Sequence, residues 1–519
     1  MTAVALPRPG RRFRPARTVR LEIKHSPVVW TLPALALIFY YDTYRTALGQ
    51  TPTWANYASL INGHILIYIC VVGSGLAAWA GAREGRRKTG DLLAATARAP
   101  WARQVTVLAA TAFWMVLAYL GETTAIYVQA ARVSTWGSPP LWPVAVGVVC
   151  TVAACAIGFT AGALFPGRFI APIVAVAVFA GEFVGFKAVD NTYDGAYGGG
   201  DSTNALLVPG QGLPHLLEAG VFYRIPPDVY VAQLMFMGGL LLATAGLLAL
   251  SPAARVPGVR GVSLAAAGGR ALVTLAAVAV AGGVAAAATA YAVAGTAQLN
   301  QQTGNWAIPA LHDAATDRPV PYTPVCASAA FRVCIHPAFA EFLDPVSAAL
   351  QPAAAEVAGL PGAPARAELA VNWALPAAAG TTSVYAYSGT GTGGVGGSWF
   401  GGPPAEIIDA YWLQGVQQGF LFWFVDGAAV NASGNPDPAQ QAVADALLAK
   451  IGAPAPDLGP FTKAGTPPAS PGPAAQASAA EIAAAARRFG SLSTPAQRAW
   501  LTAHVAALRA GRVTLAEVP

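Results

Sequence analysis

Long runs of apolar residues alternate with short polar or basic stretches over the first 295 residues of the chain. Each run holds about 20 residues, the length that an α-helix needs to cross the hydrocarbon core of a bilayer. This pattern predicts seven membrane-spanning helices and therefore a polytopic α-helical membrane protein. The expected spans lie at about 28–47, 59–82, 105–130, 142–165, 169–189, 229–250 and 271–295.

The distribution of basic residues predicts the orientation of these spans. Cytoplasmic loops of membrane proteins carry an excess of Lys and Arg. Here that excess falls in alternate connections, namely the N-terminal segment 1–25, the segment 83–104, the turn at Arg168 and the segment 251–270. We therefore expect a cytoplasmic N-terminus and an extracytoplasmic chain after about residue 296. The stretch Arg17–Lys24 fits either an interfacial helix on the inner leaflet or a flexible basic tail.

The polar and apolar pattern changes again after residue 296. Alternation over Glu368–Trp373 and Thr381–Ser388 predicts strands, and apolar helical spacing predicts helices at 339–358, 406–425 and 438–451. Whether the aromatic helix 406–425 touches the membrane is left open by its pattern. The expected divisions are a basic segment at 1–25, a six-span membrane domain at 26–250, a loop and seventh span at 251–295, an α+β extracytoplasmic domain at 296–453, a Pro/Ala linker at 454–475 and a C-terminal helical hairpin at 476–519.

Composition supports the membrane assignment. Hydrophobic residues make up 55% of the chain and charged residues only 11%, against about 25% charged residues in a soluble domain. The net charge of +6 gathers in a few short segments, so it reports membrane orientation and not nucleic-acid binding. The abundance of Arg, Ala, Gly and Pro is typical of high-GC bacteria, which points to a bacterial cell membrane.

Five cysteines fall into two groups. Cys70, Cys150 and Cys155 lie in apolar runs, where cysteine usually acts as a small core residue. Cys326 and Cys334 lie in the polar region and close a short loop, which predicts a disulfide if that region is outside the cell. The pairs Gly158-x-x-x-Gly162 and Gly181-x-x-x-Gly185 are interpreted as helix-packing sites, with a dimer seam as the alternative.

The segment 83–104 carries most of the charge between two apolar runs. Its middle, residues 89–97, fits a short amphipathic helix that is too basic to cross the membrane and that ends at Pro100. A helix of this kind lies on the cytoplasmic face, where a soluble partner can dock.

Three charged residues, Glu122, Glu182 and Lys187, fall inside apolar runs. Charges there are costly and are often functional, so they are candidate translocation-path charges. All three lie in the outer third of their spans, so structural pairing or placement at the interface is the alternative.

Motifs for catalysis are missing from the sequence. The Gly-rich stretch Gly391–Gly397 lacks the Lys-Ser/Thr ending of a phosphate-binding loop, and no Walker motif occurs elsewhere. A zinc peptidase needs two His four residues apart on a helix, and His312, His336 and His504 have no such spacing. We therefore expect no catalytic site, no metal site and no cofactor bound by this chain.

The first 250 residues resemble the six-helix permease subunits of ABC exporters that move drugs or polysaccharides, in an actinobacterial-like form with an added C-terminal extracytoplasmic domain. The interfacial stretch Arg17–Lys24, the basic loop between spans two and three, and a long external loop before span six carry this resemblance. The run REGRRKTGDLLAAT, residues 83–96, is similar to the family's coupling segment E-x-R-x-G-T-L-E-L-L-L-A-T-P.

The resemblance implies a permease dimer bound to ABC ATPase subunits, which hold ATP and Mg²⁺. The residues implied in ATPase coupling are Glu84, Arg86, Arg87, Asp91, Leu92 and Leu93. Two alternatives stay open: a membrane-anchored extracytoplasmic binding or sensing protein without transport, and a membrane metallopeptidase. The substrate, the direction of transport, the choice between homodimer and heterodimer, and the role of residues 296–519 do not follow from the sequence.

Overall fold

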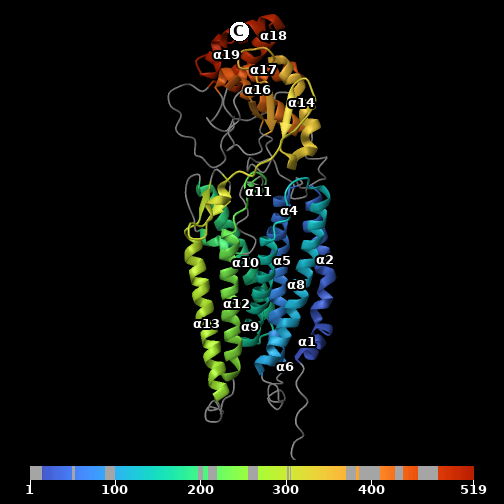
Figure 1. The fold of residues 1–519 in the computed structure, drawn as a ribbon, viewed down its shortest axis with the longest axis vertical. Helices are drawn as coiled ribbons and strands as arrows, with labels where there is room; N and C mark the ends of the chain where they lie inside the picture. The colour runs from blue at the N-terminus through green and yellow to red at the C-terminus, as the bar shows by residue number, and fades with distance from the viewer. Residues whose placement is uncertain are drawn as a thin grey trace, which may run out of the picture.

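The computed structural model describes residues 15–49, 53–87, 100–196, 203–208, 219–254, 267–300, 303, 305–369, 381–384, 410–426, 437–453 and 477–519. The molecule is elongated, with a bundle of long helices at one end and a smaller C-terminal region at the other (Figure 1). We call residues 27–294 the helical bundle and residues 320–519 the C-terminal region.

Six helices in the described part of the chain are long and apolar enough to cross a membrane, as expected for a polytopic membrane protein. They match six of the seven predicted spans. The first is continuous through a π turn and comprises α4 (Trp54–Leu60), η3 (Ile61–Ile65), α5 (Leu66–Gly81) and α6 (Arg83–Arg87). The other five are α8 (Pro100–Val133), α9 (Trp142–Leu164), α10 (Ile170–Ala196), α12 (Asp228–Ala254) and α13 (Ala267–Ala294).

The predicted span at 28–47 is helical but irregular, and it is not among these six. A 3₁₀ turn, η1 (Pro27–Thr31), leads into α2 (Leu32–Ile38), a π turn η2 (Phe39–Tyr44) and α3 (Arg45–Leu48). Proline near the start of η1 and of α2 removes backbone donors, and the π turn carries Asp42 and Thr43. The count of seven spans therefore stays a prediction.

Glycines allow α5 and α9 to pack with their backbones in contact. A Cβ atom added at Gly158 would overlap the Ser74 carbonyl oxygen, and one added at Gly162 would overlap the Ala78 carbonyl oxygen. Helices in lipid gain stability from such close approach, since burial from water does not drive their association. The prediction that Gly158-x-x-x-Gly162 is a packing site within the chain is confirmed.

Both ends of the helical bundle are defined by short elements. At one end, which we call the basic end, lie α1 (Pro15–Lys24) and α6. At the other, which we call the distal end, lie α4, η4 (Thr203–Leu207) and α11 (Ala219–Phe222), next to the C-terminal region (Figure 1). There α13 continues into an antiparallel hairpin of β1 (Gln298–Asn300) and β2 (Asn305–Ala307).

The C-terminal region combines a small sheet with helices around one hydrophobic core. The sheet order is β3-β4-β5-β6, with β3 and β4 antiparallel and the other pairs parallel. Its strands are β3 (Val325–Cys326), β4 (Arg332–Ile335), β5 (Arg366–Leu369) and β6 (Thr381–Val384), and its helical elements are η6 (Pro337–Phe342), α14 (Leu343–Val357), α16 (Ala410–Asp426), α17 (Pro438–Lys450), α18 (Ala479–Ser491), α19 (Thr494–Arg509) and η7 (Leu515–Glu517). Another 3₁₀ turn, η5 (Ala314–Asp317), precedes them.

The aromatic helix predicted at 406–425 lies in the core of the C-terminal region. Phe420 and Phe424 of α16 are fully buried in the same cluster as Leu447, Phe489 and Leu501. The described part of this helix therefore packs inside the C-terminal region. The terminal hairpin of α18 and α19 contributes to that same core.

Contacts at the distal end join the C-terminal region to the helical bundle. The Thr135 hydroxyl donates to the Pro337 carbonyl at 2.7 Å, and the Val320 amide donates to the Phe222 carbonyl at 2.7 Å. His336 is buried against the rings of Trp136, Phe222 and Tyr322. Burial lowers the pKa of His336 to about 4, so its ring is neutral at physiological pH.

Candidate functional site

The helix α1 begins the basic end of the bundle and packs against α8. Its sequence, PARTVRLEIK, places basic and apolar side chains on opposite sides, as in helices that lie on a membrane surface. The indole nitrogen of Trp114 on α8 donates to the Ile23 carbonyl at 2.9 Å. The helix predicted at Arg17–Lys24 is therefore present and is fixed to the bundle at its C-terminal end.

The short helix α6 continues α5 beyond the apolar span and is held close to its neighbours. A Cβ atom added at Gly85 would lie 2.5 Å from the Pro166 side chain, so only glycine allows this approach to the turn between α9 and α10. The Arg86 guanidinium donates to the Trp79 carbonyl at 2.9 Å and lies 5.1 Å from the centre of the Trp79 ring.

Two ion pairs tie α6 to the helices on either side. Arg83 Nη1 lies 3.8 Å from Glu22 Oε2 of α1, and Glu84 Oε1 lies 3.6 Å from Arg103 Nε of α8. The start and the end of the segment 83–104 are thereby held together, and α1 is joined to its start. Sequence reasoning missed Glu22 and Arg103, because the pairing of separate helices leaves no local signal.

The six predicted coupling residues divide into two groups. Glu84 and Arg86 make the internal contacts described above, and Arg87 is exposed on α6. Asp91, Leu92 and Leu93 lie outside the described residues. Of the three predicted coupling residues that the structure describes, Arg87 is therefore the exposed one. The contacts of Arg83, Glu84 and Arg86 hold α6, the helix that carries it.

An apolar cavity of about 510 Å³ lies beside these contacts. Its walls come from the start of η1, α5, α8 and the beginning of α10, with Glu22 and Arg83 among the lining residues. The volume falls within the range of small-molecule sites in proteins.

The three predicted path charges have different surroundings in the described part of the chain. Glu122 of α8 is 8% exposed and accepts a hydrogen bond of 2.6 Å from the Tyr68 hydroxyl on α5. Glu182 of α10 is 6% exposed, and its Oε2 atom has no hydrogen-bond partner in the described part of the chain. Lys187 is exposed, with Nζ 5.3 Å from the centre of the Phe186 ring.

His312, which lies outside the spans, contacts acidic side chains. His312 lies between two carboxylates, with Nδ1 2.8 Å from Asp228 Oδ2 and Nε2 3.1 Å from Asp317 Oδ2. Burial lowers the pKa of His312, but the hydrogen bonds to Asp317 and Asp228 outweigh it and the pKa is raised. Among the described residues, no group of three His, Cys, Asp or Glu side chains has the geometry to hold a metal ion.

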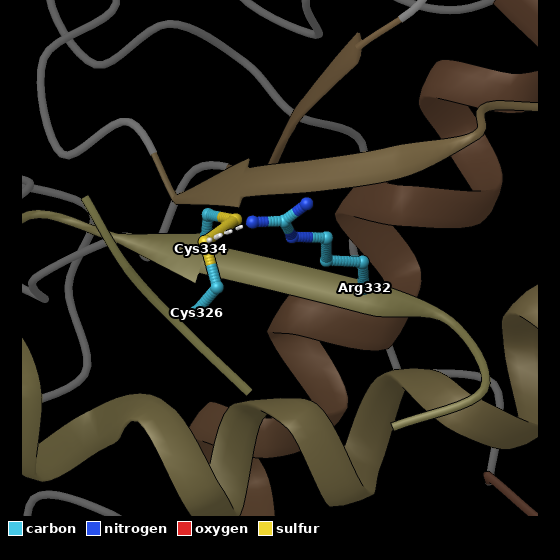
Figure 2. The surroundings of a disulfide bond; sticks show 3 residues. All are labelled: Cys326, Arg332 and Cys334. Carbon is cyan, nitrogen blue, oxygen red and sulfur yellow. Dashed lines mark hydrogen bonds between the residues drawn. A yellow bond between two sulfur atoms is a disulfide. The ribbon is translucent and has the colours of Figure 1, made fainter. Parts of the chain in front are cut away.

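Cys326 and Cys334 lie at disulfide distance, with their sulfur atoms 2.10 Å apart, as predicted. They sit opposite each other on β3 and β4, and the Arg332 guanidinium approaches Cys326 Sγ at 3.5 Å (Figure 2). The other three cysteines are buried in the bundle and free.

Comparisons of this chain with protein-family models, with curated proteins and with solved structures find no match.

Proposed function

We propose that this chain is the membrane-spanning permease subunit of an ABC exporter in a bacterial cell membrane. A separate ATPase subunit binds ATP and Mg²⁺ and docks on the segment 83–104 at the basic end, which faces the cytoplasm. The C-terminal region is extracytoplasmic, which agrees with the cysteine pair that it contains.

The observation that carries this proposal is the set of contacts that joins α1, α6 and α8. Glu22–Arg83, Glu84–Arg103 and the Trp114–Ile23 hydrogen bond link three helices at the point where the partner would dock. Exposed ion pairs of this length contribute only about 0–1 kcal/mol each to stability. Their effect is geometric, because a displacement of α6 is passed to α1 and α8 and through α5 into the bundle.

A second copy of the permease is supported by the surface of α10. This helix is the least buried of the six apolar helices within the chain. Its exposed side chains recur at helical spacing and form one apolar face, made of Phe169, Ile173, Val176, Phe179 and Phe183. We assign this face to the permease dimer, with the remaining exposed apolar surface in contact with the lipid bilayer.

The test is purification of the tagged full-length protein from its native membrane in mild detergent, followed by mass spectrometry. In parallel, a variant carries Arg86→Ala, Arg87→Ala, Leu92→Ala and Leu93→Ala. The matched control carries Arg255→Ala, Arg260→Ala and Arg270→Ala in the other predicted cytoplasmic loop.

We expect an ABC ATPase to co-purify with the native chain and with the control, and its recovery with the first variant to fall at least about tenfold. Equal recovery with both variants would refute docking on the segment 83–104. If no ATPase is recovered under conditions that keep a known ABC transporter intact, the transporter proposal itself is wrong.

A second candidate function is favoured by the hydrophobic core that the C-terminal region forms largely from its own residues. A membrane-anchored protein that binds or senses an envelope component needs such a core and needs no ATPase. In the same experiment, this function predicts recovery of an envelope component without an ATPase.

A further inference from the structure

A chain of polar side chains crosses the distal half of the helical bundle and ends at a buried carboxylate. Glu122, 8% exposed, accepts the 2.6 Å hydrogen bond from Tyr68. The Thr43 side chain, which is fully buried, lies next to the Tyr68 hydroxyl. These groups come from α8, α5 and η2, so three helices contribute to one network.

The network continues from Thr43 to the surface of the bundle. The Thr43 hydroxyl donates to Asp42 Oδ2 at 3.3 Å, and His64 Nδ1 lies 3.0 Å from the same oxygen. The side chains of Asp42 and His64 are 50% and 29% exposed. These groups therefore line a path from the exposed Asp42 carboxylate and the partly exposed His64 ring to buried Glu122.

Two π turns build this path. Asp42 and Thr43 lie on η2 and His64 lies on η3, and the two turns contact each other. Single π turns inside helices occur frequently at functional sites, because the extra residue redirects side chains and breaks the regular backbone ladder. Asn62, on the same π turn as His64, is fully buried, and its amide atoms have no hydrogen-bond partner in the described residues.

We propose that Glu122 is a proton-binding site that exchanges its proton with water at the distal end through Tyr68, Thr43, Asp42 and His64. This inference goes beyond the proposed transport function and does not depend on an ATPase. It makes the charge inside the bundle depend on the pH outside the cell.

The transfer balances without any further reactant. Tyr68 gives its hydroxyl proton to the Glu122 carboxylate and receives one from Thr43, whose hydroxyl rotates to reach it. Thr43 is reprotonated by Asp42, which takes a proton from the His64 imidazolium or from water. The net result is one proton moved from outside water to Glu122.

The groups around Glu122 have two opposing effects on its charge. Burial among apolar side chains disfavours the carboxylate, and the hydrogen bond from Tyr68 favours it. Protonation of Glu122 removes the buried charge on which both effects act.

The experiment is infrared difference spectroscopy of the full-length protein in lipid nanodiscs after a pH jump. The pH is varied between about 4 and about 9, a window that starts near the ordinary pKa of a carboxyl group and extends above it. The carboxylic C=O band that Glu122→Gln removes is assigned to Glu122. We expect Tyr68→Phe, which removes only the hydroxyl, to slow the appearance of this band at least about tenfold.

Two further variants keep the result interpretable. Asp42→Asn changes an exposed residue and should also slow protonation, whereas Glu182→Gln changes a buried carboxyl on another helix and should leave the rate unchanged. The proposal is overturned if Glu122→Gln removes no pH-dependent band. It is equally overturned if Glu122 is protonated at the native rate in both the Tyr68→Phe and the Asp42→Asn variant.

Discussion

The helical bundle and the C-terminal region are stabilised by opposite uses of side-chain volume. In the bundle, Gly158 and Gly162 bring the backbone of α9 against that of α5. In the C-terminal region, large side chains such as Phe420 and Phe489 are fully buried. Lipid offers no hydrophobic driving force between helices, whereas water does. Added volume should therefore disrupt the bundle, and lost volume should disrupt the C-terminal region.

The largest effect is expected from Gly162→Leu. The new side chain would overlap the Ala78 carbonyl, a backbone atom that cannot move without separating α5 from α9. We expect a cost of at least about 4 kcal/mol, enough to prevent recovery of folded protein in mild detergent. The matched control is Gly121→Leu, since nothing lies within 4 Å of a Cβ atom there. A normal yield of Gly162→Leu would contradict the close-packing account.

Removing volume from the C-terminal region comes next. Phe420 is fully buried in α16, so Phe420→Ala should lower the free energy of unfolding of the C-terminal region by about 3–5 kcal/mol. Thermal unfolding of the full-length protein measures it. Phe420→Leu, which keeps most of the volume, should cost clearly less. If Phe420→Ala unfolds at the native temperature, this core does not hold the C-terminal region together.

His336 makes the joint between the two regions sensitive to acid. Burial lowers its pKa from 6.5 to about 4, so between these values the unfolded state binds more protons than the folded state. The stabilisation by neutral His336 is complete above about pH 6.5 and is lost as the pH falls through about 4. This loss amounts to about 3 kcal/mol at most.

Unfolding temperatures measured across this pH window should fall less steeply in His336→Phe than in the native protein. The substitution keeps an aromatic ring between Trp136 and Tyr322 but removes the titrating group. If the unfolding temperatures of the two proteins fall equally with pH, a group other than His336 causes the acid sensitivity.

The disulfide gives a smaller effect, confined to the C-terminal region. Its cysteines are only 8 residues apart, so the closed loop is short and the bond stabilises by about 2.5 kcal/mol in the chain-entropy model. Replacing both Cys326 and Cys334 by Ser should lower the unfolding temperature of that region. The bundle, whose three cysteines are free, should unfold as before. Equal destabilisation of both regions would show that they unfold as one unit.

Hydropathy predicted the long helices well, because crossing a bilayer requires length and apolarity that a sequence displays directly. It did not predict the π turns at Phe39–Tyr44 and Ile61–Ile65, because a change of hydrogen-bond register leaves the composition unchanged. It also did not decide whether the aromatic helix α16 touches the membrane, since a core helix and a membrane-dipping helix share the same pattern.

The candidate sites also differ in how far the sequence predicted them. The cysteine pair was predictable, since both residues lie close together in one polar stretch. The contacts Glu22–Arg83 and Tyr68–Glu122 were not, because they join helices that are far apart in sequence. The local sequence around Glu122 does not indicate that Tyr68 is its partner. The packing of α5 against α8 brings the two side chains together.

The proposed topology places the two ends of the molecule in opposite compartments. Cysteine labelling of intact cells with a membrane-impermeant maleimide tests this directly, with Arg87→Cys at the basic end and Ala480→Cys in α18, both at exposed positions. The native free cysteines are buried and should stay unlabelled. We predict that Ala480→Cys is labelled in intact cells and Arg87→Cys only after permeabilisation. Labelling of Arg87→Cys in intact cells, with protection of Ala480→Cys, would contradict the account.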